Sequence, residues 1–376
     1  MGWFEVYCLG AIVLYVVFML KNIFTFYPRK KNISLPENYT PQLSVSIIIA
    51  ARNEEENIIR CLQSIAHQEF PKEQLEILVV NDHSEDKTTE LAGTFLKENF
   101  RHFKILHLAE REKGKKTAII KAVEQSSGSV IITRDADTVT ENNFWLKEIV
   151  FQFENKNCDL LISPVLLSGT NSFFSSFQKY ENLAVTFLGL SMAKNKLPIV
   201  CSGANLAYKK EIFLTLDPYR NNLHIASGDD MFLLKAAFSG KCQIQPNVSA
   251  NSLVYTQTED TFKKAVFQRL RWASKTGKIS TLPVFISGLI LLFGNIACLI
   301  ALIWPFIDSY YLPFCLFTLT IKFIIDFLLL FLSARMLNQK VNLIWYLPAF
   351  VINLIYTPTI ALGSFFVKPN WKDRSI

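Results

Sequence analysis

The sequence is poor in residues that bind metals through nitrogen or sulfur. It has only five His, scattered along the chain, and its seven Cys occur one at a time, without a Cys-x-x-Cys pair. This spacing excludes a zinc motif and a dense disulfide framework. We interpret the cysteines as free thiols, which fits a reducing cytoplasmic compartment.

Charge is also scarce. Charged residues make up 19% of the chain and hydrophobic ones 50%, and the mean hydropathy is +0.24. Soluble domains usually carry more charge. The apolar excess lies at the two ends, and the middle has an ordinary soluble composition. We therefore expect a soluble-type domain flanked by membrane-spanning segments.

Trp3–Phe26 is long and apolar enough to span a membrane. It has neither a basic segment before it nor a small-residue cleavage site, so we interpret residues 1–28 as an anchor and not as a removed signal peptide. Arg29, Lys30 and Lys31 follow at once. Because basic residues mark the cytoplasmic side, we expect the middle of the chain inside.

Three further apolar stretches predict a C-terminal membrane region over residues 280–368, followed by a basic tail at 369–376. The stretches are Leu282–Phe306, Leu312–Leu332 and Leu343–Val367. The net charge of +7 suits contact with anionic lipid head groups and requires no nucleic acid partner. We expect a multi-pass protein of the plasma (inner) membrane.

Two features of this region leave alternatives open. Lys322 and Asp326 are four residues apart, so one helix face can pair them, as a structural pair or as a functional polar site. Pro348 and Pro358 allow the last stretch to be a re-entrant element. Simple alternation of spans would otherwise leave the basic tail outside, against the positive-inside rule.

The middle segment, residues 40–275, alternates strand-like and helix-like patterns. Apolar, β-branched runs begin at Ser44, Leu75, Phe103 and Ser129, and helical spacing follows each of the first three. Continuous apolar strands are typical of a parallel sheet buried on both faces. The alternation predicts an α/β domain with a mostly parallel sheet.

Polar clusters follow these strands, at Arg52–Glu56, Asn81–Asp86, Lys113–Lys116 and Asp135–Asp137. In open α/β sheets, ligands bind beyond the carboxyl ends of the strands. The four clusters therefore predict one ligand site at that edge of the sheet.

Asp135 and Asp137 suit a divalent cation. Two carboxylates one residue apart can hold Mg²⁺ or Mn²⁺ together with ligand phosphates. A surface loop is the alternative for such a triplet alone, and the other clusters favour the cation. Asp82 can accept hydrogen bonds from a base or ribose, or belong to a helix-capping stretch with Ser84 and Asp86.

Basic and small residues complete the pattern. Lys113, Lys115 and Lys116 surround Gly114 and suit phosphate binding, or form a solvated basic loop. The small residues of Ser202–Asn205 allow a ligand to approach the backbone.

Acidic pairs precede two predicted helices. Asp229 and Asp230 begin an amphipathic helix, either as capping residues or with one carboxylate as a general base. Glu259 and Asp260 precede the next helix, where capping is the better interpretation.

That next helix carries a cationic and aromatic group just before the chain becomes apolar. Gln268, Arg271 and Trp272 are spaced i, i+3 and i+4, so one helix face presents all three. We expect Arg269 to point elsewhere and to contact lipid or solvent, together with Lys275.

Seven stretches occur in a fixed order over about residues 43–272: AARNEEENI, VVNDHSED, KGKKTAI, RDADT, CSGANLAY, SGDDMFLL and QRLRW. The set resembles the membrane-bound family 2 glycosyltransferases, which include cellulose, hyaluronan and poly-N-acetylglucosamine synthases and ceramide glucosyltransferases. The resemblance implies a GT-A-type nucleotide-sugar-binding domain with a mixed, mostly parallel sheet, plus transmembrane helices. It also implies inverting, metal-dependent transfer from a nucleotide-diphosphate sugar, by family habit a UDP-sugar.

The resemblance also implies roles for single residues. Nucleotide-sugar contacts are expected from Ala51, Arg52, Asn53, Glu54, Asp82, Lys113, Asp135, Gln268 and Arg271. Asp137, with Asp135, would hold Mg²⁺ or Mn²⁺, and Asp230 would be the catalytic base. Asp229 and Trp272 would border the acceptor, although the family often has Glu at the position of Asp229.

Four apolar segments are few for the channel of a polymer synthase, so we expect a hydroxyl of a membrane lipid as acceptor. One alternative is a processive polysaccharide synthase that extends a cell-surface glycan. Another is a non-catalytic nucleotide-binding membrane scaffold, against which Asp135, Asp137, Asp230 and Arg271 argue. A nucleotidyltransferase can share the α/β plan but does not need the Gln-x-x-Arg-Trp group beside a membrane.

Overall fold

The structure is a computed structural model that describes residues 2–26, 35–225, 227–274 and 281–366, with the backbone of 370–371 and 374–375. The basic cluster Arg29–Lys31, Lys275 and most of the predicted tail at 369–376 lie outside the described residues.

By its internal contacts the chain divides into two compact units. The sheet unit comprises Lys31–Ser168 and Val200–Gln257. The helical unit comprises Met1–Lys30, Gly169–Ile199 and Thr258–Ser375. Each unit is discontinuous in sequence, and the predicted domain limits stay predictions.

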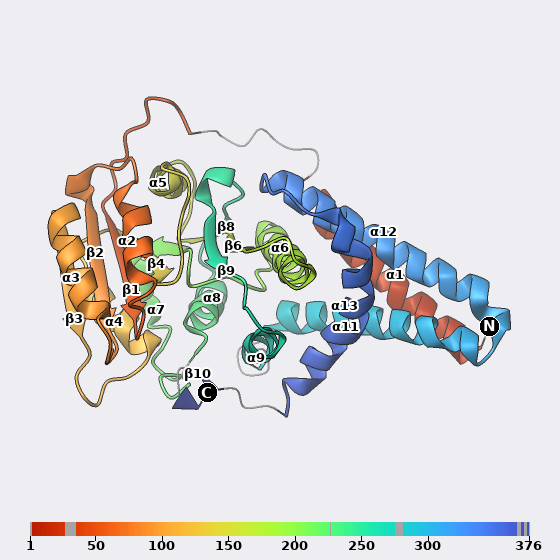
Figure 1. The fold of residues 1–376 in the computed structure, drawn as a ribbon. Coiled ribbons are helices and arrows are strands. Elements are labelled where there is room, and N and C mark those ends of the chain that lie inside the picture. Colours follow the sequence, from red (N-terminus) through yellow and green to blue (C-terminus); the bar gives the residue numbers. More distant parts are fainter. Residues whose placement is uncertain are drawn as a thin grey trace. The chain divides into compact units, whose positions relative to one another are not determined.

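The sheet unit contains a seven-stranded sheet in the order β3-β2-β1-β4-β7-β5-β8 (Figure 1). Among its described strands only β7 runs antiparallel to its neighbours, which confirms the predicted mixed, mostly parallel sheet. The strands are β1 (Val45–Ala51), β2 (Leu75–Asn81), β3 (His102–His107), β4 (Val130–Asp135), β5 (Leu160–Ile162), β7 (Leu206–Lys209) and β8 (Ile244–Pro246). A separate parallel pair joins β6 (Val165–Ser168) to β9 (Val254–Gln257).

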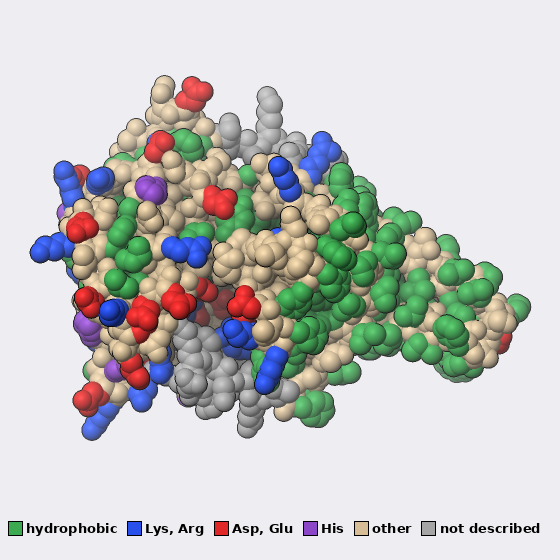
Figure 2. All heavy atoms as spheres, in the orientation of Figure 1, with side chains coloured by type: hydrophobic (Ala, Val, Ile, Leu, Met, Phe, Trp, Pro, Cys, Tyr) green, Lys and Arg blue, Asp and Glu red, His purple; other side chains and the backbone are tan. Residues whose placement is uncertain are grey.

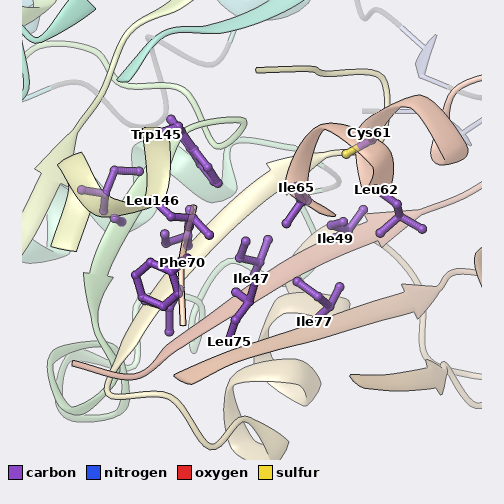
Figure 3. Packing of buried hydrophobic residues seen from close by; sticks show 14 of the residues in the cluster. Ile47, Ile49, Cys61, Leu62, Ile65, Phe70, Leu75, Ile77, Trp145 and Leu146 are labelled. Carbon is purple, nitrogen blue, oxygen red and sulfur yellow. The ribbon is translucent and has the colours of Figure 1, made fainter. Parts of the chain in front are cut away.

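Helices cover both faces of this sheet. They are α2 (Ile58–Ala66), α3 (Thr88–Asn99), α4 (Lys115–Gln125), α5 (Trp145–Asn155), α7 (Lys210–Leu216) and α8 (Asp229–Ser239). The side chains of Ile47 and Ile49 in β1 pack with Leu62 and Ile65 of α2, in a core that α3 and α5 also enter (Figure 3). Helix α4 contacts β1 and β2. Strand β1 is almost entirely buried, which explains its apolar sequence.

The helical unit consists of α1 (Trp3–Phe24), α6 (Phe173–Lys194), α9 (Phe262–Ala273), α11 (Leu282–Ile303), α12 (Leu312–Met336) and α13 (Tyr346–Gly363). Helix α1 packs against α11 and α12, and α13 packs against α11 and α9 (Figure 1). Four described segments are long and apolar enough to cross a membrane: Trp3–Phe24, Leu282–Phe306, Ser309–Met336 and Leu343–Gly363. Apolar side chains dominate the visible surface of this helix bundle (Figure 2).

A buried ion pair lies inside this bundle. Lys322 forms the predicted pair with Asp326, and Tyr15 of α1 donates a hydrogen bond to the same carboxylate. The Lys322 side chain is fully buried, and its ammonium lies 4.8 Å from the centre of the Tyr15 ring. These partners offset the cost of placing both charges among apolar helices.

Helix α13 is one continuous helix with Pro358 inside it, so the break at the prolines that the sequence allowed does not occur. Pro348 stands in the first turn, where its missing N–H costs no helical hydrogen bond. Neighbouring helices can support a proline inside a spanning helix.

Candidate active site

The loops after β1 and β2 are interlocked. The Asn53 N–H donates to Ser84 Oγ (3.1 Å), and Asn53 Oδ1 accepts from the Glu85 N–H (2.9 Å). The Glu54 N–H donates to Thr88 Oγ1 (2.7 Å). Asn53 has a φ of +50°, a left-handed conformation that Asn tolerates better than most residues. Two of the predicted donor-binding residues are thus fixed by the neighbouring loop.

Asp86 belongs to the same interlock. Its carboxylate accepts the N–H groups of Thr88 (3.0 Å) and Glu55 (3.1 Å), so Asp86 fixes the start of α3 and the neighbouring loop. This agrees with the capping interpretation of the stretch.

Asp82 ties β2 to the loop before α4. Its side chain is buried, and Oδ2 accepts the Gly114 N–H at 3.0 Å, while its own N–H donates to Ala51 O at 2.9 Å. Gly114 has a φ of +93°, which a residue with a Cβ rarely adopts. The carboxylate therefore fixes the end of the loop that carries Lys113, directly before α4, and its predicted nucleoside contact stays a prediction.

Lys115 lies at the centre of an ion cluster. Its Nζ is 2.5 Å from Asp135 Oδ1 and 3.2 Å from Asp229 Oδ2. Burial lowers the pKa of Lys115, but the charges of Asp135, Asp229 and Asp230 outweigh it and raise that pKa, so the group stays a cation. Lys113, which the sequence favoured, is exposed. The signal that could have favoured Lys115 over Lys113 is its position as the first residue of the helix that follows the third strand.

Gly203 explains why small residues precede β7. A Cβ added there would lie 2.8 Å from Asp229 Oδ2 and 3.1 Å from Lys115 Nζ. The Gly203 N–H also donates to Asp230 Oδ2 at 3.3 Å. The glycine thus allows the backbone to approach the ion cluster.

Asp229 and Asp230 open helix α8, but their surroundings differ. Asp229 is buried and paired with Lys115, whereas Asp230 is partly exposed. Asp230 Oδ1 accepts the Met231 N–H at 2.7 Å, at the N-terminus of α8. Of the two acids, Asp230 is the more accessible to a bound molecule.

Asp135 and Asp137 fit a divalent cation. The pKa of Asp137 is raised to about 6, first by burial and then by the charges of Asp135 and Glu54. Solvent nevertheless reaches this carboxylate. A cation would relieve this repulsion, and carboxylate oxygens are the ligands that Mg²⁺ and Mn²⁺ prefer. No group of three or more His, Cys, Asp or Glu in the described ranges could hold a metal ion, so these two could supply only part of its coordination.

A buried arginine, which the sequence analysis did not single out, supports the end of β4. The guanidinium of Arg134 lies 4.6 Å from the centre of the Trp145 ring, and its Nε donates to Thr138 Oγ1 at 3.2 Å. Thr138 Oγ1 in turn donates to Asp135 O at 2.7 Å. These contacts fix the strand end that carries the two carboxylates.

The Gln-x-x-Arg-Trp group belongs to the helical unit. Gln268 on α9 donates to Glu259 Oε1 at 2.8 Å, and the main chain of Glu259 is held by two 3.0 Å hydrogen bonds to the Gln178 side chain. The helix cap is Thr261, whose Oγ1 accepts the Lys264 N–H at 3.3 Å. Glu259, which we expected to cap the helix, therefore orients Gln268.

The expectation that Arg269 contacts lipid or solvent is wrong. Its side chain is buried, its Nε donates to Glu181 Oε2 of α6 at 3.0 Å, and its guanidinium lies 4.4 Å from the centre of the Trp272 ring. The two residues are three positions apart, so they share a helix face. Trp272 is 40% exposed and Arg271 is partly buried.

Residues 46–216 match the model of glycosyl transferase family 2. A glycosyltransferase, AglE, from Haloferax volcanii is 29% identical over 193 residues, which cover 51% of this chain and 60% of the relative. The chain thus spans about 60% of the length of such relatives.

Two further relatives have more specific names. A beta-monoglucosyldiacylglycerol synthase from Trichormus variabilis is 24% identical over 183 residues, 48% of this chain and 38% of the relative. A poly-beta-1,6-N-acetyl-D-glucosamine synthase from Staphylococcus epidermidis is 23% identical over 380 residues, 95% of this chain and 87% of the relative.

The fold is similar to that of a mannosyltransferase from Pyrobaculum calidifontis, solved in complex with GDP-Man and Mn²⁺. The TM-score is 0.60 at 16% identity, and the match covers 96% of this chain and 99% of the other. At this identity the likeness shows the fold alone, and it confirms the expected GT-A-type architecture.

Replacing Asp137 by Asn should stabilise the metal-free protein above pH 6. The pKa of Asp137 is raised from its ordinary value to about 6 in the folded protein. Ionisation of this carboxyl as the pH rises between these two values therefore destabilises the folded state. Below pH 4 the carboxyl is protonated in both states, so the substitution should have no effect there. Since solvent screens the repulsion, we expect a rise of only about 2 °C in Tm, measured by thermal unfolding in EDTA. An equal effect at pH 3.5 and pH 7.5 would contradict this assignment.

Arg269→Ala should destabilise the helical unit by about 2–4 kcal/mol, because it leaves the partly buried Glu181 carboxylate without its cation. Burial already raises the pKa of Glu181, and Arg269 opposes that shift. Thermal unfolding in detergent would measure the loss. Lys264→Ala is the control, since Lys264 and Asp260 are exposed and 3.9 Å apart. Equal Tm values for the two variants would contradict a buried ion pair and support the original expectation that Arg269 contacts lipid or solvent.

Proposed function

We propose that this chain, whose residues 46–216 match the model of glycosyl transferase family 2, transfers a sugar from a nucleotide-diphosphate sugar to a hydroxyl group, with inversion at the anomeric carbon. The observation that carries the proposal is the ion cluster at the carboxyl edge of the sheet, where Lys115 is held by Asp135 and Asp229 beside the accessible Asp230. A binding-only scaffold has no need of a carboxylate placed as a base.

The donor is assigned to the interlocked loops. Ala51, Arg52, Asn53, Glu54 and Asp82 surround the nucleoside in this proposal. A UDP-sugar is our first choice from the resemblance, and a GDP-sugar is the alternative, since the structurally similar mannosyltransferase was solved with GDP-Man.

The phosphates are assigned to Lys113, Lys115 and Arg271. Asp135 and Asp137 would hold Mg²⁺ or Mn²⁺. When bound, the cation would offset the negative charge that develops on the departing nucleoside diphosphate. Lys115 and Arg271 would supply the same stabilisation from the protein.

Asp230 is assigned to the acceptor. Its carboxylate takes the proton of the acceptor hydroxyl while that oxygen attacks the anomeric carbon. The bond from this carbon to the diphosphate oxygen breaks in the same step, and the nucleoside diphosphate leaves with the bonding electrons. A single base without a separate nucleophile suits such a one-step displacement. Asp229 and Trp272 border the acceptor in this assignment.

A membrane lipid is the acceptor we favour. The glucosyldiacylglycerol synthase relative supports it. The alternative is a processive polysaccharide synthase. It is favoured by the poly-N-acetylglucosamine synthase relative, whose match covers 95% of this chain. We further propose that the sheet unit is cytoplasmic and that the protein spans the plasma (inner) membrane several times.

The acceptor can be identified in membranes that contain the protein. They would be incubated with UDP- or GDP-linked radioactive sugars and with Mn²⁺, Mg²⁺ or EDTA, and the products separated by organic extraction. We expect metal-dependent label in the organic phase. Label in a long polymer that stays out of the organic phase would establish the alternative, and no transfer from any donor would refute the proposed function.

Asp230→Asn should abolish transfer and leave donor binding nearly intact. The amide keeps the shape of the carboxylate and can accept one of its two backbone N–H groups, but it cannot take a proton. Loss of a general base lowers kcat by about 10²–10⁴-fold. Turnover and nucleotide affinity would be measured on the same preparation. Asp229→Asn is the comparison, because Asp229 is buried and paired with Lys115 and is therefore less accessible to an acceptor than Asp230. Wild-type-like turnover of Asp230→Asn would rule out this residue as the base.

A further inference from the structure

His83 has an unusual backbone beside the candidate site. Its φ is +57°, in the left-handed region that is costly for a residue with a Cβ. It directly follows Asp82, and its side chain is partly buried. Such outliers persist only where the surroundings hold them, which makes the contacts of His83 informative.

The imidazole ring of His83 reaches the loop before α4. Its Nε2 lies 2.9 Å from the main-chain oxygen of Glu112. A carbonyl can only accept, so the ring must carry a proton on Nε2 and donate it. Asp82 accepts the Gly114 N–H at 3.0 Å. Two adjacent residues at the end of β2 thus hold both ends of the stretch Glu112–Gly114.

This stretch presents two lysines. Lys113 lies between the two tethers and is exposed, and Lys115 follows directly and enters the ion cluster. The side chain of Glu112 also fixes the loop, because its Oε2 accepts hydrogen bonds from the Ala109 N–H (2.9 Å) and from Lys121 Nζ (3.0 Å). A fixed loop holds its lysines in place before a ligand arrives, which lowers the entropy cost of binding.

We propose that His83 is a positioning residue for the nucleoside-diphosphate part of the donor. It acts through Glu112–Gly114, which it holds so that Lys113 and Lys115 are placed for phosphate oxygens. The proposal rests on the proposed function, since it assigns the phosphates to these lysines.

Three variants separate the tether from the backbone strain. His83→Gly removes the ring and relieves the left-handed backbone, so the fold should not weaken. His83→Asn tolerates the backbone but is too short to reach Glu112. His83→Gln keeps a long side chain with an N–H donor. Lys241→Gly is the matched control, because Lys241 is exposed, has the same φ of +57° and lies outside the candidate site.

Hydrogen–deuterium exchange of residues 109–116 reports the tether, and calorimetric titration with UDP and GDP plus Mn²⁺ reports binding. In the Gly and Asn variants we expect faster exchange of this segment and about 5–10-fold weaker nucleotide binding, the size of one lost hydrogen bond. The KM of the donor should rise by the same factor, with kcat within about twofold. Gln should restore part of the affinity, and the Lys241→Gly control should bind like the wild type.

Faster exchange with unchanged nucleotide affinity would overturn the proposal, because the tether would then serve the fold alone. Unchanged exchange would overturn it too, by showing that His83 does not hold the loop. If the wild type bound neither nucleotide, the proposed function would fail, and the donor role of His83 with it. The exchange measurement separates these cases, since it requires no activity.

Discussion

The sheet unit depends on one lysine among carboxylates. A parallel sheet directs its strand ends to one edge, and in this chain Asp135, Asp229 and Asp230 all come to that edge. Their mutual repulsion would oppose folding without a cation among them. Lys115 supplies it from the first turn of α4, within ion-pair distance of two of the acids. The same cluster would offer carboxylates to a metal ion and the ammonium of Lys115 to a phosphate ligand.

Hydrogen bonds link the loops around this cluster to one another. Asn53 and Glu54 are held by the loop after β2, and Asp82 and His83 hold the loop before α4. Most of these bonds join side chains to main-chain groups, so they fix backbone positions. This suits a site that must present several polar groups at once, because preorganised groups lose less entropy when a ligand binds.

The helical unit buries charge in a different way. Arg269 pairs with Glu181 between α9 and α6, and Lys322 pairs with Asp326, to which Tyr15 of α1 also donates. The first pair joins two helices that are far apart in the sequence, and Tyr15 links the second pair, which lies within α12, to α1. A buried pair adds little stability compared with apolar packing, but removing one partner is costly. Such pairs therefore define which helices lie together.

The sequence alone determined the elements and their order. Apolar runs ending in polar clusters predicted the strands and the edge where Asp135 and Asp137 lie, because these patterns reflect local burial. It could not rank Lys113 against Lys115, or foresee that Arg269 is buried against Glu181. Both depend on which residues of distant segments meet, Asp229 in one case and α6 in the other. Only the tertiary structure decides such contacts, since a charge is solvated or paired according to its neighbours in space.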